Sequence, residues 1–270
     1  DVTLDNLITR AQNTLENGIF DEAIDYYVKI LEKSSYNEIV KMKFAISSAL
    51  FNKGCEAFKN NQDDTAIDYF NKLIKLNPEF NGGDSNIVNS KNNAPLHLAV
   101  IENNKELVKL FLANKADINK KTGGLDTPLH LAAHRNYTEL VELLIDNKAD
   151  IDLANEGGDT PIHLAIVENH IDSARLLLEK GANVNIKNTS SGDTPLHLAV
   201  YKNSLAGVML LLEYKAEADI KNNNWHIPLE LAEQIKVDHK IVELLKEYTE
   251  MVSKKTVHIE IGPVSYAKPL

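Results

Sequence analysis

Histidines recur in this chain at a nearly constant spacing, and of all its residues they are the most obvious candidates for chemistry. His97, His130, His163 and His197 stand at almost equal intervals, and His134 lies one helical turn after His130. Two histidines on successive turns of one helix can bind a metal ion. No glutamate lies between them to act as a base, and a buried residue that forms the same hydrogen bonds in each repeat explains the period better. We therefore expect no metal site and no cofactor.

Other arrangements of reactive residues are weak. The single cysteine, Cys55, has no histidine near it in sequence and is interpreted as an inert residue. The pairs Gly123-Gly124 and Gly157-Gly158 lack the strand and helix that a phosphate-binding loop needs. No Ser-His-Asp set and no pair of carboxylates stands out, so we expect a protein that is not an enzyme.

The histidines belong to a longer repeated phrase. Prolines recur at the same near-constant interval, as Pro95, Pro128, Pro161, Pro195 and Pro228, and the first four stand in Ala/Thr-Pro-Leu/Ile-His. Proline loses no hydrogen bond in the first turn of a helix, and a preceding threonine can cap that helix. Each phrase predicts a short inner helix, followed by an outer helix with apolar residues at helical spacing.

This phrase, and its period of about 33 residues, resemble the ankyrin repeat family. The resemblance covers roughly residues 91 to 250, as five repeats. It implies an all-α fold, a helical repeat solenoid, whose usual role is to bind other proteins. The fifth repeat departs from the pattern, with Ile227 and Glu230 in place of Thr and His, as terminal repeats often do. Where the family has glycine between the two helices, this chain has an amide residue that tolerates a left-handed turn: Asn103, Asn136, Asn169 and Asn203.

The segment before the array carries a different phrase twice, Gly18 to Tyr27 and Asp63 to Phe70. It resembles the tetratricopeptide repeat, a pair of helices. The resemblance places Ala23 and Ala66 where two helices touch, Tyr27 and Phe70 as aromatic wedges, and Gly54 as a small contact residue. Extra residues between the copies predict a long helix over residues 37–60.

Composition shifts divide the chain into four predicted parts: 1–80 TPR-like, 81–92 a polar linker, 93–250 the ankyrin array and 251–270 a tail. In the tail, residues 256–261 alternate like a strand before Gly262-Pro263. The chain begins at Asp1 rather than Met. We interpret it as an excerpt of a longer protein, whose next domain would begin with this strand.

Charge and composition narrow the class of partner. The net charge of −10 argues against binding to nucleic-acid phosphates. No signal peptide and no apolar run of membrane-spanning length is visible, and a single cysteine favours a reducing, cytoplasmic location. Abundant Asn, Lys and Ile hint at an AT-rich genome. We therefore expect an adaptor, or an effector of an intracellular microbe that acts on a host protein in the host cytosol or nucleus.

The ankyrin resemblance places the partner on the inner helices and hairpin tips. Trp225, the only tryptophan, either binds there or packs on the terminal repeat, and each lysine either binds or is simply solvated. Several basic residues in an acidic protein suggest a partner with an acidic segment. The predicted binding residues are Ile101, Glu102, Lys121, His134, Arg135, Val167, Glu168, Lys187, Tyr201, Lys202, Lys221, Trp225 and His226.

The tetratricopeptide resemblance predicts a second groove, lined by Ser48, Phe51, Cys55, Phe58 and Lys59. Alternatively, Phe51 and Phe58 pack against the linker or the first ankyrin repeat. Asp5 and Gln12 stand where family members that clamp chaperone tails use Lys and Asn, so such a clamp is not expected.

The leading hypothesis is thus an interaction scaffold. The first alternative is the targeting arm of an enzyme whose catalytic domain lies outside this segment, which the complete reading frame would reveal. The second is a structural spacer, which would expose no aromatic anchors on the binding side.

Overall fold

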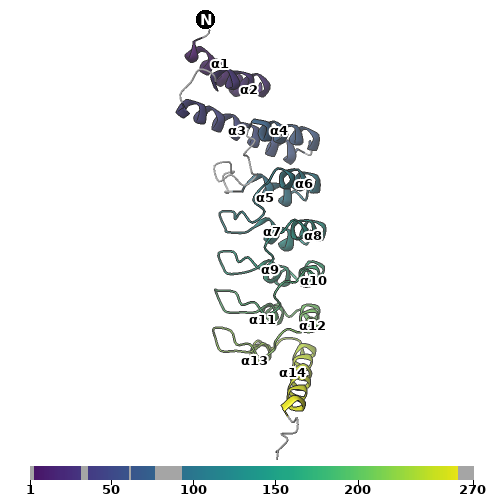
Figure 1. The fold of residues 1–270 in the computed structure, drawn as a ribbon. Coiled ribbons are helices and arrows are strands. Elements are labelled where there is room, and N and C mark those ends of the chain that lie inside the picture. Colours follow the sequence, from purple (N-terminus) through teal and green to yellow (C-terminus); the bar gives the residue numbers. More distant parts are fainter. Residues whose placement is uncertain (1–2, 32–35, 61, 77–92, 261–270) are drawn as a thin grey trace, which may run out of the picture. The chain divides into compact units, whose positions relative to one another are not determined.

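The computed structural model describes residues 3–31, 36–60, 62–76 and 93–260 (Figure 1). Every regular element in these ranges is a helix, which confirms the predicted all-α class. The chain divides into two compact units. The first comprises Asp1–Leu131 with Asp146–Ala149, and the second comprises Ala132–Ile145 with Asp150–Leu270.

The first unit opens with two helix pairs, α1 (Leu4–Glu16) with α2 (Phe20–Leu31), and α3 (Tyr36–Lys59) with α4 (Asp63–Leu76). The long helix α3 agrees with the one predicted over residues 37–60. The ring of Phe70 lies against Gly54 so closely that a Cβ there would come within 2.6 Å of it. Ala23 and Ala66 are completely buried. The contacts that the tetratricopeptide resemblance implied are therefore present.

The first ankyrin pair, α5 (Pro95–Ile101) and α6 (Lys105–Ala113), belongs to the same unit. Phe111 of α6 meets Phe70 of α4 edge to face, with ring centroids 5.2 Å apart. Both rings are 1% exposed. Aromatic burial of this kind joins the TPR-like helices and the first ankyrin repeat through one core.

The second unit is built from repeated helix pairs. Helices α7 (Pro128–His134) and α8 (Thr138–Asp146) form the second repeat and run across the boundary between the two units. The third repeat is α9 (Pro161–Val167) with α10 (Ile171–Glu179), and the fourth is α11 (Pro195–Tyr201) with α12 (Leu205–Glu213). The fifth is α13 (Pro228–Ile235) with α14 (His239–Glu260). Each predicted Pro begins its inner helix.

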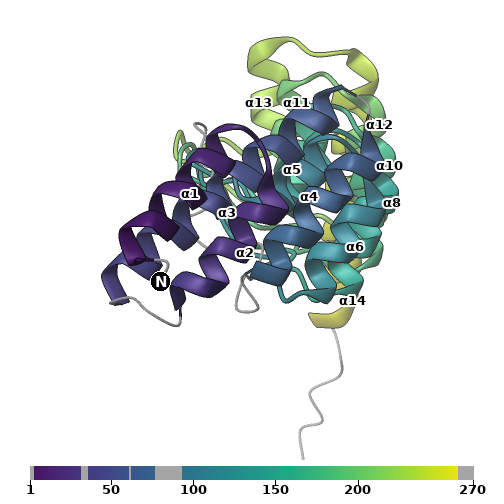
Figure 2. The same ribbon diagram turned by 90° about the horizontal axis from the view of Figure 1, so that it is seen from above.

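Inner helices stack on inner helices, and outer helices on outer helices. Helix α11 contacts both α9 and α13, while α12 contacts α10 and α14. Figure 2 shows α11 and α13 on one side and α10 and α12 on the other. The core between the two layers consists of small aliphatic side chains, and Ile166, Ala174 and Leu177 are all fully buried.

The asparagines between inner and outer helices do more than replace glycine. Asn136 and Asn203 have φ of 57° and 53°, in the left-handed region that asparagine tolerates better than most residues. Their side chains also reach the next repeat. Asn136 Oδ1 accepts a 2.8 Å hydrogen bond from the Ser173 hydroxyl, and Asn203 Oδ1 accepts one of 2.8 Å from the Asp238 N–H. Glycine at these positions would allow the turn but not the bond.

The predicted strand over residues 256–261 is wrong, because α14 continues as helix to Glu260. Residue 261 onward lies outside the described residues. A short alternation of apolar residues is ambiguous, and here it follows helix without a Gly or Pro to end it before Gly262.

Candidate protein-binding surface

The loops before the inner helices are hairpins fixed by asparagine side chains. Asn188 Oδ1 accepts from the N–H of Asp193 (3.1 Å), and Asn222 Oδ1 accepts from the N–H groups of Asn224 (3.0 Å) and His226 (3.1 Å). The amide groups also tie each hairpin to the one before it. Asn188 donates to Asp159 (2.9 Å) and Asn222 donates to Asp193 (2.8 Å). Figure 1 shows these hairpins projecting on the same side.

Sequence reasoning missed these residues. A usable signal was present, because Asn155, Asn188 and Asn222 recur once per repeat, and so do Asp159 and Asp193. Residues of this kind are common in turns and can form bonds within the turn. Only the fold shows that the bonds also cross between repeats and make the hairpins a rigid platform.

The periodic histidines clamp each repeat to the next hairpin. His163 Nδ1 accepts from the Thr160 N–H (3.0 Å), and its Nε2 lies 3.1 Å from the carbonyl oxygen of Ile186. His197 Nε2 lies 2.9 Å from the carbonyl oxygen of His226. Because both ring nitrogens are engaged, the hydrogen-bonding interpretation is confirmed. Burial lowers the pKa of His163 and His197, and also that of His97.

Reactive groups are scattered over the part of the chain that the structure describes. No set of three or more His, Cys, Asp or Glu side chains comes together there as a metal site. Cys55 is half-buried on α3.

Trp225 occupies a strained place at the tip of the last described hairpin. Its φ is 65°. Gly158 (φ 76°) and Gly192 (φ 68°) occupy the same place in the two preceding hairpins, and Leu125 (φ 61°) occupies it in the hairpin before those. A Cβ at Gly158 would come within 2.2 Å of the backbone nitrogen of Thr189, and one at Gly192 would come within 3.0 Å of that of Asn223. The described chain places no further hairpin beside Trp225, so a side chain fits.

Space for the Trp225 side chain does not mean that the side chain stabilises the fold. A left-handed conformation costs a residue with a Cβ about 1–2 kcal/mol, and the Trp225 side chain is 77% exposed, so little burial offsets that cost. The alternative that this tryptophan packs on the terminal repeat is wrong. The hairpin itself requires the left-handed φ, since Leu125 adopts it at the same place, but Trp225 is the more exposed of the two, at 77% against 40%.

A second aromatic residue lies at the end of the stacked inner helices. Tyr201 is the last residue of α11 and is 67% exposed, and Lys202 follows it as the exposed C-cap. At the same place on α9, Val167 is half-buried and Glu168 is the exposed C-cap. Because α9 and α11 pack together, these two pairs lie at the same end of the stack.

The predicted hairpin lysines of the second unit are free. Lys187 and Lys221 occupy matching places on adjacent hairpins. Both are exposed, and neither side chain forms a hydrogen bond or ion pair with the described residues. They form a positive rim on a chain of net charge −10.

The remaining predicted residues divide between the two units. Ile101, Glu102 and Lys121 belong to the first unit, where Glu102 alone is fully exposed. His134, Arg135 and His226 belong to the second, where His134 is exposed and the other two are half-buried. We restrict the candidate surface to the third to fifth repeats, which lie wholly within the second unit, and it then consists of Val167, Glu168, Lys187, Tyr201, Lys202, Lys221, Trp225 and His226.

Phe51 does not line the groove that was predicted in the tetratricopeptide-like (TPR) helices. Phe51 is 1% exposed and packs against Phe70, with ring centroids 6.2 Å apart, so this ring belongs to the core rather than to an open groove. Ser48 and Cys55 are half-buried. The side chains of Phe58 and Lys59 lie outside the described residues.

Family models account for most of the described repeats. One ankyrin-repeat model, of three copies, matches residues 96–188, and another, of many copies, matches residues 177–232. A tetratricopeptide-repeat model matches residues 47–80. The chain is an ankyrin-repeat protein. No curated protein matches it.

The family models confirm the two resemblances drawn from the sequence. In this ankyrin-repeat protein, the TPR match covers the second of the two helix pairs that precede the array. The helices described are all too short or too polar to cross a membrane.

Proposed function

We propose that this ankyrin-repeat protein is a scaffold that binds a partner protein across the hairpin tips and inner-helix ends of its third to fifth repeats. The observation that carries the proposal is Trp225, which is strained and almost fully exposed. Tryptophan, tyrosine and arginine are the residues that most often dominate binding energy at protein interfaces. Tyr201 gives the same surface a second aromatic anchor.

The charges of this surface favour an acidic partner segment. Lys187, Lys202 and Lys221 are exposed, and Glu168 is the one acidic residue of the candidate surface. A local positive rim steers an acidic segment to the surface in spite of the overall negative charge. The rigid hairpins then hold the anchors in place, which reduces the entropy lost on binding.

We further propose that the partner is a host protein and that the chain acts as an effector of an intracellular microbe. The support is compositional: abundant Asn, Lys and Ile, and a single cysteine that suits a reducing cytosol. Its site of action would be the host cytosol or nucleus.

Affinity capture tests both proposals. The wild-type chain and its Trp225→Gly variant are immobilised and exposed in parallel to lysates of host cells and of the source organism. Mass spectrometry should find a host protein that is retained by wild type and depleted on the variant. A partner found only in the lysate of the source organism would overturn the effector role. A partner retained equally by both baits would overturn the site.

A further inference from the structure

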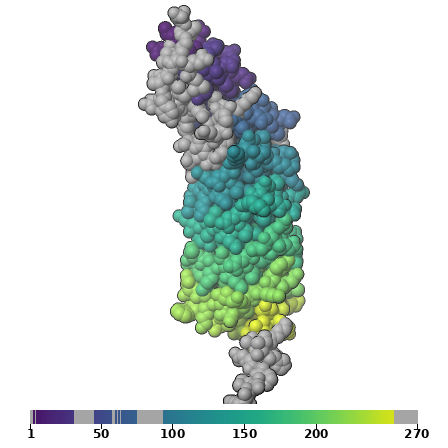
Figure 3. Space-filling model, in the orientation of Figure 1, coloured from purple at the N-terminus to yellow at the C-terminus, as the bar shows by residue number. Residues whose placement is uncertain are grey.

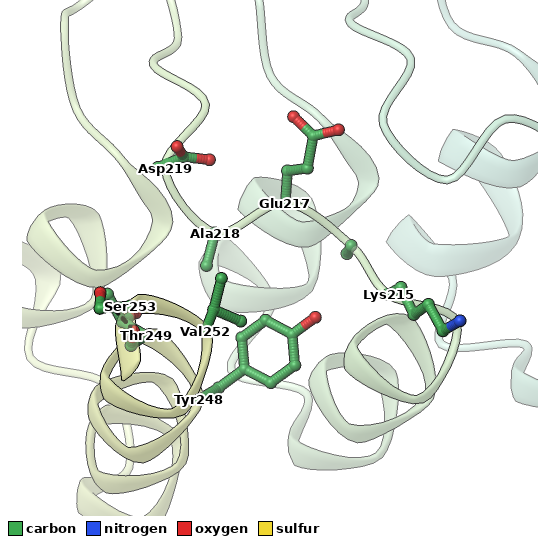
Figure 4. Close-up of a pocket in the computed structure, with 9 residues that line it drawn as sticks. Lys215, Glu217, Ala218, Asp219, Tyr248, Thr249, Val252 and Ser253 are labelled. Atoms are coloured by element: carbon green, nitrogen blue, oxygen red, sulfur yellow. Dashed lines mark hydrogen bonds between the residues drawn. The ribbon is translucent and has the colours of Figure 1, made fainter. Parts of the chain in front are cut away.

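A separate pocket lies at the end of the array, away from the hairpins. It has a volume of about 350 Å³ and is formed by the turn after α12 and the second half of α14. Figure 4 shows Tyr248 and Val252 of α14 facing that turn, with Asp219 at one end of the rim and Lys215 at the other. The proposed function does not use this pocket.

In the interior of the second unit, the same place is filled by the next repeat. The turns after the outer helices are joined by backbone N–H groups. Asn183 donates its N–H to Asp152 Oδ1 (3.0 Å), and Glu217 donates its N–H to Asn185 Oδ1 (2.9 Å). Each of these turns also buries a small residue, as Ala216 does at 1% exposure. The next member of the series Asp152 and Asn185 is Asp219.

Within the described residues, helix α14 does not supply the backbone N–H partner for Asp219. Helices α12 and α14 begin at matching places of successive repeats, so Glu250 and Met251 correspond to Ala216 and Glu217. α10 and α12 end after nine residues, but α14 continues for 22. The N–H groups of residues 250 and 251 are therefore used inside a helix.

The described residues therefore leave this place beside the turn unfilled. The Asp219 side chain makes no hydrogen bond with the described residues and is exposed. Val252, on the side of α14 that faces the turn, is 43% exposed although it is apolar. Thr249 and Ser253 also line the pocket, and their hydroxyls donate to the carbonyl oxygens of Leu245 and Thr249. Apolar surface and an open acceptor thus stand next to each other.

We propose that this pocket binds a short segment of a partner polypeptide in which a small apolar residue is flanked by basic residues. The small residue takes the place against Ala218, Tyr248 and Val252 that an alanine of the next repeat would otherwise fill. A backbone N–H and a neighbouring basic side chain meet the carboxylate of Asp219, with Glu217 beside it. The carboxylate of Asp219 is a charged acceptor, so its hydrogen bond is stronger when the donor is cationic. Lys215 lies at the opposite end of the rim from Asp219.

The test is an NMR titration of the full, ¹⁵N-labelled chain with the tripeptide acetyl-Arg-Ala-Arg-amide, up to about 10 mM because so small a ligand binds weakly. Saturable shifts should be confined to the amides of residues 215–219 and 248–253. Acetyl-Glu-Ala-Glu-amide should not bind. Asp219→Asn should weaken binding about fivefold, the effect of losing one exposed ion pair, and Val252→Trp should abolish it by filling the pocket.

Asp172→Asn serves as the matched control, because it removes the same charge from an exposed site on α10 and should leave the titration unchanged. Shifts spread over the acidic surface, or shifts that persist in Val252→Trp, would overturn the proposal. So would the absence of saturable shifts, or an Asp219→Asn variant that binds as wild type does. Unchanged amide spectra away from the pocket verify that each variant is folded.

Discussion

At the residue scale, we expect Trp225 to lower the stability of the fold while it contributes to partner binding. Trp225→Gly should raise the free energy of unfolding by about 0.5–1 kcal/mol, because glycine relieves the left-handed strain and an exposed ring loses few contacts. Gly192→Ala, at the same place one repeat earlier, should lower it by about 1–3 kcal/mol, because its Cβ meets Asn223. Urea unfolding curves measure both. A Trp225→Gly variant less stable than wild type by about 1 kcal/mol would mean that the ring is part of the core.

The histidine clamps predict a dependence of stability on pH. Burial lowers the pKa of His97, His163 and His197 in the folded state, whereas the unfolded chain titrates near the usual value of about 6.5. Below that pH the unfolded state binds more protons, so stability is full above it and is lost as pH falls. Each clamp can cost at most about 1.4 kcal/mol per pH unit.

Denaturant unfolding between about pH 7.5 and pH 5.5 tests this dependence, because carboxylates titrate mainly below that range. A His197→Gln variant should be less stable at the higher pH, since glutamine fits the clamp poorly, but its stability should fall less steeply with acid. An identical slope in wild type and variant would show that His197 is not among the groups responsible.

Residue roles could be predicted from the sequence where a residue type has one common structural role at its position. The prolines and histidines of the repeated phrase marked helix starts and clamps, and both are found there. Asn188 and Asp159 were not foreseen, because a turn residue can bond locally or to a neighbouring repeat and the sequence does not distinguish the two. The open side of Trp225 also needed the structure, since exposure depends on what stacks beside it.

At the element scale, the Asn136 bridge should contribute measurably to the joint between repeats. Asn136→Gly keeps the left-handed turn but loses the bond to Ser173, and should cost about 1–2 kcal/mol. Asn136→Ala adds the strain of a left-handed residue with a Cβ and should cost about 2–4 kcal/mol. Thermal or urea unfolding should rank wild type, Gly and Ala in that order. A Gly variant as stable as wild type would show that the bridge contributes nothing.

The outer-helix core offers a simpler test. Leu177 of α10 is completely buried, so Leu177→Ala should lower the free energy of unfolding by about 2–5 kcal/mol through lost burial and a cavity. Leu176, half-buried on the same helix, provides the control, and Leu176→Ala should cost clearly less. Equal losses in urea unfolding would show that the face of α10 is assigned incorrectly.

Helix α14 shows where reading elements from sequence fails. The periodic phrase fixed the starts of the inner helices because proline has a strong positional preference. The end of α14 had no such marker, and a short run of alternating residues was taken for a strand. The same extension of α14 creates the terminal pocket, so neither the pocket nor the role of Asp219 could be foreseen from the sequence.

At the scale of the whole molecule, the net charge and the exposed residues of the candidate surface favour recognition of a protein segment. The chain carries a net charge of −10, yet the exposed lysines of the candidate surface are unpaired within the described residues. Figure 3 shows the fourth and fifth repeats as a continuous packed surface on the face that is drawn, with α14 beside them. The exposed Trp225 and Tyr201 and the lysines of the candidate surface offer anchors and charge, which suits recognition of a protein segment.

The most direct test is the kinetics of binding to the captured partner, measured by surface plasmon resonance at two salt concentrations. Trp225→Gly and Tyr201→Ala should each weaken binding by about tenfold or more, mainly through faster dissociation. Lys187→Glu with Lys221→Glu should instead slow association and reduce its dependence on salt. Met209→Ala, which truncates a side chain 56% exposed on outer helix α12, should bind as wild type does. If Met209→Ala abolishes binding while the other variants keep it, the partner binds the outer helices, and the central claim is wrong.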